Sequence, residues 1–139
     1  MNKALLALSV LILVSLACGS AAPEVSDRCV PASALQMEYL RNGIKQIQES
    51  NDALQGYAVR SGDYERVWFV AAEITGPNIK PKEAVGLWAI SGELDFPTTV
   101  FSVDGFAKEF SYWSDGTKAE PHLSVSDDGA QEALSCAKQ

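Results

Sequence analysis

ERVWFVAAEI, residues 65–74, is the stretch that decides the fold, because it is rich in the β-branched and aromatic residues that strands favour. Turn residues bound it, with Ser61-Gly62-Asp63 before it and Gly76-Pro77 after it. Similar segments occupy residues 55–60, 85–91 and 98–103, separated by breaks of the same kind. This half of the chain therefore predicts a sheet of at least four strands.

A helix is predicted before the sheet, over residues 33–54. Its apolar positions recur at three-, four- or seven-residue steps, at Met37, Leu40, Ile44, Ile47 and Leu54. Ser33 followed by Gln36 fits a capping box at the start of this helix. Gly56 offers a stop just beyond the last apolar position.

Residues 105–113 fit two structures. Phe106, Phe110 and Trp113 share one face of a helix that Asp104 would cap, and this short helix is the preferred interpretation. If Asp104-Gly105 is instead a two-residue hairpin turn, the sheet gains a strand.

The C-terminal stretch predicts a brief strand over residues 122–125 and then a helix with Ser126 as its N-cap. Asp127 and Asp128 in its first turn suit the positive end of the helix dipole. The predicted fold class is α+β, with the N-terminal helix and this short C-terminal helix on one face of a mainly antiparallel sheet of four to five strands.

The first residues have the parts of an export signal: Lys3, an apolar run and small residues before Cys18. The run is shorter than the roughly 20 residues that span a bilayer. Val14-Ser15-Leu16-Ala17-Cys18 resembles the lipobox of bacterial lipoproteins, although the family usually has Leu where this chain has Ser15. The alternative is a soluble protein cut after Ala21 or Ala22, a position that Pro23 disfavours.

The resemblance implies a signal peptide over residues 1–17 and a diacylglyceryl or palmitate-type anchor on Cys18. Residues 18–28 would then be a lipidated tether, and residues 29–139 a single α+β domain. The protein would lie on the extracytoplasmic face of a bacterial cell membrane or outer membrane, with the choice of membrane left open.

Three cysteines are an odd number for an exported protein unless one is otherwise used. Lipidation of Cys18 leaves the pair Cys29 and Cys136, and an oxidising compartment favours their bonding. We predict a Cys29–Cys136 disulfide, which would close a loop of about 100 residues.

Composition and motifs exclude several classes of function. The net charge is −7, from 11 basic and 18 acidic residues, and an acidic surface disfavours nucleic acid. His122 is the one histidine, so histidine clusters for metal binding or catalysis are excluded. The sequence predicts no catalytic residue, no metal and no cofactor.

Two groups of residues are candidates for a binding surface: Tyr112 with Trp113 beside a turn, and Lys80 with Lys82 in a proline-containing loop. The leading hypothesis is a non-enzymatic, membrane-anchored module that binds an envelope protein or a small ligand. An assembly factor that pairs through a sheet edge is the second hypothesis. A small hydrolase is the third, and it needs two acids, drawn from Glu93, Asp95, Asp104, Glu109 or others, in one cleft.

The lipoprotein assignment predicts the intact mass of the native protein. Material from the membrane fraction should begin at Cys18 and carry a diacylglyceryl group, and it should have no alkylatable thiol before reduction. A soluble species that lacks Cys18 would contradict the assignment.

Overall fold

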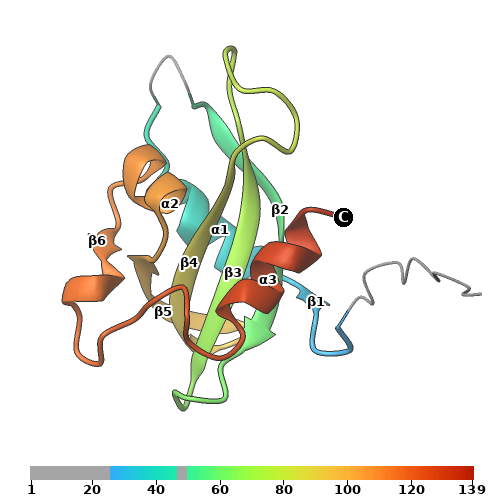
Figure 1. Ribbon diagram of the computed structural model, residues 1–139. Helices are drawn as coiled ribbons and strands as arrows, with labels where there is room; N and C mark the ends of the chain where they lie inside the picture. Colours follow the sequence, from blue (N-terminus) through green and yellow to red (C-terminus); the bar gives the residue numbers. More distant parts are fainter. Residues whose placement is uncertain (1–25, 47–49) are drawn as a thin grey trace, which may run out of the picture.

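The computed structural model describes residues 26–46 and 50–139, which form an α+β fold. A six-stranded sheet has the order β1-β2-β3-β4-β5-β6, so chain order and spatial order coincide (Figure 1). The strands are β1 (Val30–Pro31), β2 (Asp52–Arg60), β3 (Val67–Thr75), β4 (Val85–Glu93), β5 (Phe96–Ser102) and β6 (Ser114–Asp115). The helices are α1 (Ala34–Asn42), α2 (Gly105–Phe110), the 3₁₀ turn η1 (Gly116–Lys118) and α3 (Ala130–Ala137).

The four predicted strands are confirmed as β2 to β5, which pair antiparallel in succession. The predicted count of four to five is too low, because β1 and β6 add two-residue pairings at the edges. β6 runs parallel to β5, so the sheet is mixed. Two-residue strands carry no sequence periodicity, which is why the pattern missed them.

The two central strands are apolar on both faces of the sheet. In β3, Val70 and Ile74 belong to one buried cluster, while Phe69 and Ala71 belong to the other. Strand side chains alternate between faces, so a continuous apolar run needs a cover on each side. The apolar character of nearly every position in residues 67–74 is therefore explained by a sheet that is covered on both faces.

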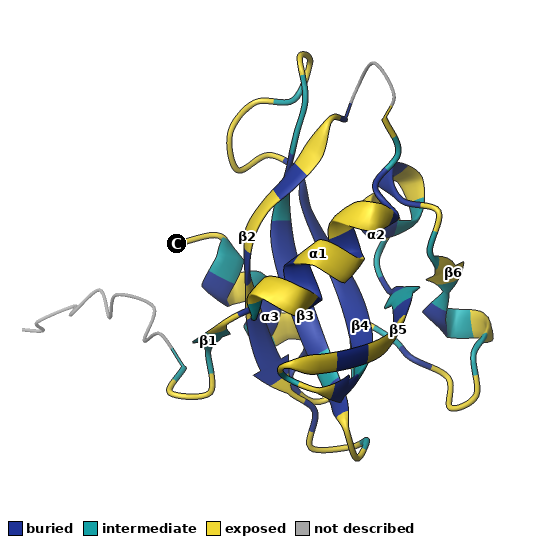
Figure 2. Cartoon of the chain, turned by 180° about the vertical axis from the view of Figure 1, so that it is seen from behind, coloured by how far each residue is buried: buried dark blue, intermediate teal, exposed yellow. Residues whose placement is uncertain are grey.

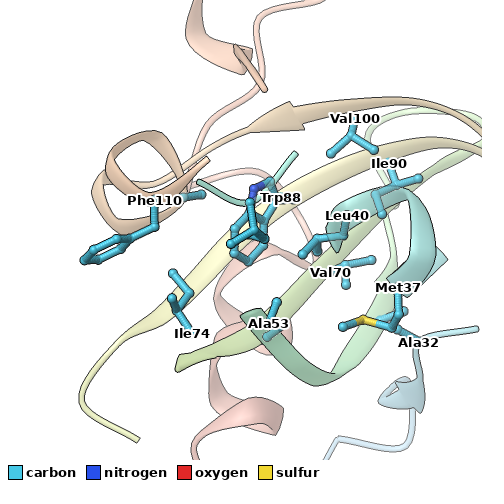
Figure 3. Packing of buried hydrophobic residues seen from close by; sticks show 14 of the residues in the cluster. Ala32, Met37, Leu40, Ala53, Val70, Ile74, Trp88, Ile90, Val100 and Phe110 are labelled. Atoms are coloured by element: carbon cyan, nitrogen blue, oxygen red, sulfur yellow. The ribbon is translucent and has the colours of Figure 1, made fainter. Parts of the chain in front are cut away.

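One layer consists of α1 and α2, and Trp88 of β4 lies at its centre (Figure 3). The Trp88 ring is fully buried between Leu40 of α1 and Phe110 of α2, and its Nε1 donates a hydrogen bond to Ser111 Oγ at 3.2 Å. An indole buried with its N–H paired combines a large apolar contact with a satisfied donor. Figure 2 shows that the outer face of α1 is exposed.

The other layer is α3, which places Ala130, Ala133 and Cys136 against Phe69 and Leu87. α3 lies in front of the sheet in Figure 1, and α1 and α2 lie behind it. The prediction that both terminal helices cover one face is therefore wrong. Periodicity shows that a helix has an apolar side, but not which face of a sheet that side meets.

The predicted N-terminal helix begins as expected but ends early. The capping box of Ser33 and Gln36 is confirmed, but α1 ends at Asn42 and residues 52–54 are in β2. A side chain on Gly43 would overlap the Trp113 indole, and Lys45 N donates to Phe110 O at 2.9 Å. Pairing of residues 43–45 with the chain after α2 therefore ends the helix, although the apolar spacing would continue it. Ile47, one of the apolar positions used for the prediction, lies outside the described residues.

The short helix predicted over residues 105–113 is confirmed at its start as α2, with Asp104 Oδ1 accepting from Ala107 N at 2.8 Å. It ends at Phe110, so Trp113 lies outside the helix. The strand predicted over 122–125 is absent from the described chain, and α3 begins at Ala130 after Gly129, not after Ser126. Gly129 has a φ of 91°, and Asp127 accepts from Ser124 N at 2.7 Å in a turn. Asp127 is therefore used in a turn ahead of the helix, and Asp128 accepts from Arg28 and from Gly62 N, so neither lies in the first helical turn.

Cys29 and Cys136 lie at disulfide distance, with their Cα atoms 6.3 Å apart across 107 positions of sequence. The bond joins the start of the described chain to α3. In the chain-entropy model a loop of this length stabilises the folded state by about 4 to 5 kcal/mol.

The packing of Trp88 predicts that Gly86→Ala is destabilising. The added Cβ would overlap the Trp88 ring, whose Cζ3 would lie 2.8 Å away. Overpacking of this kind costs about 1 to 3 kcal/mol, measurable by urea denaturation. Gly105→Ala is the matched control, because its Cβ would meet no atom within 4 Å. Equal stability of the two variants would contradict the packing described.

Candidate functional site

Tyr112 and Trp113, the two aromatic residues predicted to form a binding surface, have different environments. Tyr112 follows α2 and is 75% exposed. Trp113 is half-buried, and its Nε1 donates a hydrogen bond to Leu40 O at 3.1 Å. Tyr112 is therefore available to a partner, whereas Trp113 holds α1 against the β6 edge.

Lys80 and Lys82 belong to the β3–β4 loop, which stands apart from α2 in both views (Figures 1 and 2). Lys80 pairs with Glu83 at 3.3 Å. Lys82 has a φ of 61°; its N–H donates to Glu73 Oε1 and its Nζ to Gln139 O, each at 2.6 Å. These lysines make contacts within the chain, and the structure does not bring them together with Tyr112.

Lys45 is a residue of this surface that sequence reasoning missed. Its Nζ donates to Glu109 O at 2.6 Å and to Lys108 O at 3.3 Å, so it satisfies carbonyls at the end of α2. The same ammonium group lies 5.6 Å from the centroid of the Tyr112 ring, within cation–π range. No sequence signal marked it, since the spacing placed it in the middle of a helix.

Backbone hydrogen bonds fix the position of Tyr112. Its N–H donates to Gly43 O at 2.8 Å, and Ile44 forms an isolated antiparallel bridge with Ser111. Two segments almost 70 positions apart are thereby joined in register. Tyr112 is consequently exposed on a rigid backbone rather than on a free loop.

An open depression of about 440 Å³ lies at the start of α2, lined by Asp104, Gly105, Phe106 and Glu109. The Phe106 side chain is 44% exposed, and its ring stacks on Phe110 at a centroid distance of 6.4 Å. Because Phe110 is buried in the core, Phe106 is held in place while one side of it faces solvent. The depression combines an apolar surface with two carboxyl groups.

Asp104 is the acid with a raised pKa in this depression, and the main cause is its burial. Its Oδ1 accepts hydrogen bonds from Ala107 N at 2.8 Å and from Leu87 N at 3.1 Å, which partly oppose that rise. Lys138 and Lys108 oppose it further through their charges. Burial has the largest effect, so the Asp104 carboxyl is poorly solvated.

An ion pair fastens β6 to α2. Lys108 Nζ lies 2.8 Å from Asp115 Oδ1, and Asp115 also accepts from Thr117 N. The Lys108 hydrogen bond is the main cause that lowers the pKa of Asp115 to about 2. Lys108 is thus already paired on the side of α2 that faces β6.

A second depression, of about 250 Å³, is lined by Glu65, Arg66, Ser91, Gly92 and Thr98. Arg66 pairs there with Glu93 at 3.3 Å. None of its lining residues is a large apolar side chain. It offers charged and small polar groups but no apolar side chain, and so less apolar surface for a partner than the depression at α2.

The described part of the chain has no group of three or more His, Cys, Asp or Glu placed to hold a metal ion. None of its helices is long and apolar enough to cross a membrane. No family model, curated protein or solved structure matches the chain.

The position of Asp104 predicts two separable effects on stability. Asp104→Ala removes the helix cap and should cost about 1 kcal/mol or more, while Asp104→Asn keeps an acceptor and should restore most of that loss.

The pKa of Asp104 also predicts a pH dependence. Because burial raises this pKa above the ordinary value of 3.8 for an aspartate, the folded state binds the proton more tightly than the unfolded state. The stability of wild type relative to Asp104→Asn should therefore rise as the pH falls from 7 toward 4. Denaturation curves across that range measure it, and a falling difference would contradict the assignment.

Proposed function

We propose that the protein is a membrane-anchored interaction module of the bacterial envelope, with its anchor on Cys18 and its contact surface around α2. Cys18 lies outside the described residues, and the anchor rests on the lipobox resemblance. The contact surface consists of Phe106, Tyr112 and the Lys45 ammonium group. These three groups form the α2 surface.

The position of the first described residues supports this arrangement. The described chain begins at the β1 edge of the sheet, and the α2 surface lies beside β6 at the opposite edge (Figure 1). Arg28 pairs with Asp128 at 2.6 Å and with Glu132 at 2.9 Å, so the point where the tether enters is fixed. A short tether of about ten residues would then hold the β1 edge near the membrane and leave the β6 edge free.

The observation that carries the proposal is the 75% exposure of Tyr112 on a backbone fixed by hydrogen bonds. A rigid exposed aromatic side chain costs little conformational entropy when it is buried by a partner, and Tyr is enriched at interface centres. Phe106 enlarges the apolar part, and Lys45 with Glu109 supplies a polar rim.

The assembly-factor alternative has one observation in its favour. Among the described residues, β6 pairs only with Phe101 and Ser102, so the outer edge of β5 over residues 96–100 has no strand partner. Phe96 at that end is 74% exposed. An added strand from a larger protein would fit this edge.

The hydrolase alternative also has one observation in its favour, because Asp104 and Glu109 line the same depression and burial raises the pKa of Asp104. In that case a protonated Asp104 would act as general acid and Glu109 as base. Turnover of chromogenic esters or glycosides that Asp104→Asn and Glu109→Gln each abolish would favour this alternative over the module.

The module proposal predicts that a partner captured from solubilised membranes is lost with Tyr112→Ser and with Phe106→Ser. Phe96→Ser is the matched control, because it removes an equally exposed aromatic residue from another part of the sheet. Retention of the partner by the control, with at least a fivefold loss in both test variants, supports the α2 surface. Loss with Phe96→Ser alone would replace it by pairing at the β5 edge.

A further inference from the structure

We infer that the depression beside α2 receives a positively charged side chain, Lys or Arg, that stands next to an apolar residue in a partner protein. The inference rests on the proposed function and names the chemistry of the partner. Its observations are the volume of the depression, the charge of its lining and the exposed Phe106 ring.

The size of the depression suits a side chain of a partner. Its volume of about 440 Å³ falls within the roughly 300–1,000 Å³ of ordinary ligand pockets. It is open rather than enclosed, so a side chain on another protein surface can enter without a change in the backbone. Its walls are the cap and first turn of α2, which the hydrogen bonds of Asp104 fix.

The lining carries negative charge with no cation among its members. Asp104 and Glu109 supply two carboxyl groups, and among the described residues the Glu109 carboxylate forms no ion pair or hydrogen bond. Of the neighbouring cations, Lys108 pairs with Asp115 and Lys45 donates to backbone carbonyls. Lys138 acts on Asp104 through its charge, but it does not line the depression. A cation from outside would therefore complement the site and offset the poor solvation of Asp104.

The Phe106 ring supplies the apolar half of the recognition. It is stacked on Phe110 with an angle of 7° between the ring planes, so its orientation is set by the core. An Arg or Lys stem can lie along such a ring, and the charged head gains from the ring face. An adjacent apolar residue of the partner would cover the rest of the exposed ring.

The negative charge of the depression disfavours acidic ligands. The chain has a net charge of −7, and an acidic depression repels acidic peptides and anionic headgroups. A basic-apolar motif on a protein is therefore the occupant that both the charge and the Phe106 surface favour.

The test is a titration of the full-length, detergent-solubilised protein with two probes, acetyl-Leu-Arg-amide and acetyl-Leu-Glu-amide, followed by backbone amide NMR. The Arg probe should bind in the millimolar range and shift the amides of Gly105, Phe106 and Glu109. The Glu probe should shift them at least fivefold less. Equal responses, or no response to the Arg probe, would overturn the inference.

Variants locate the binding. Glu109→Gln should weaken the Arg probe about threefold, as expected for a solvent-exposed ion pair, and Phe106→Ala should weaken it by more. Glu120→Gln and Phe96→Ala are matched controls at exposed positions and should leave binding unchanged. An affinity that Glu109→Gln does not alter, or cleavage of the probe, would overturn the inference.

The two proposals fail separately. Probe binding requires neither the lipid nor the partner, so a protein without an anchor can still bind the Arg probe. Loss of the membrane partner in Tyr112→Ser without any response to the Arg probe would leave the module standing and remove the basic motif.

Discussion

The attachment of α3 to the second face of the sheet is the constraint on which the rest of the structure depends. β3 and β4 are apolar on both faces, so neither strand is stable in water until both layers are present. α3 has only eight residues, too few to be stable as an isolated helix. The Cys29–Cys136 bond and the ion pairs of Arg28 hold it where Phe69 and Leu87 need a cover.

The α2 surface is a consequence of how the opposite layer is packed. Trp88 donates to Ser111 Oγ, and Ser111 Oγ in turn donates to Ala107 O at 2.5 Å, so the buried indole fixes the end of α2. The chain leaving α2 then pairs with residues 43–45, which fixes the backbone of Tyr112 while its side chain is exposed. The exposed aromatic residue and the buried one are thus parts of one arrangement.

Local signals in the sequence predicted what local chemistry determines. The four main strands, the capping box of α1 and the Asp104 cap all follow from residue type and near neighbours. The pairing of Cys29 with Cys136 followed from the number of cysteines instead. The end of α1, the face covered by α3 and the β6 pairing depend on contacts between distant segments. Periodicity contains no information about those contacts, and it therefore extended α1 into β2.

For the candidate surface, the sequence identified Tyr112 from its place beside a turn but gave Trp113 the same status. The difference between them is the hydrogen bond from Trp113 to Leu40, which is a tertiary contact. Lys45 and Phe106 belong to the surface because of tertiary contacts as well, with the carbonyls of α2 and with Phe110 respectively. Exposure of an aromatic residue is decided by what lies across from it, and one sequence does not show that.

The Cys29–Cys136 bond and the ion pairs of Arg28 also determine where a pulling force on the N-terminal end enters the fold. Tension applied to the chain before Ser26 reaches Arg28 and Cys29 first, and through them α3. The two-residue pairing of β1 with β2 would otherwise be peeled apart one hydrogen bond at a time. Because Cys29 precedes β1, the disulfide would carry part of the pull directly to α3, and the load would enter the sheet at the edge opposite β6.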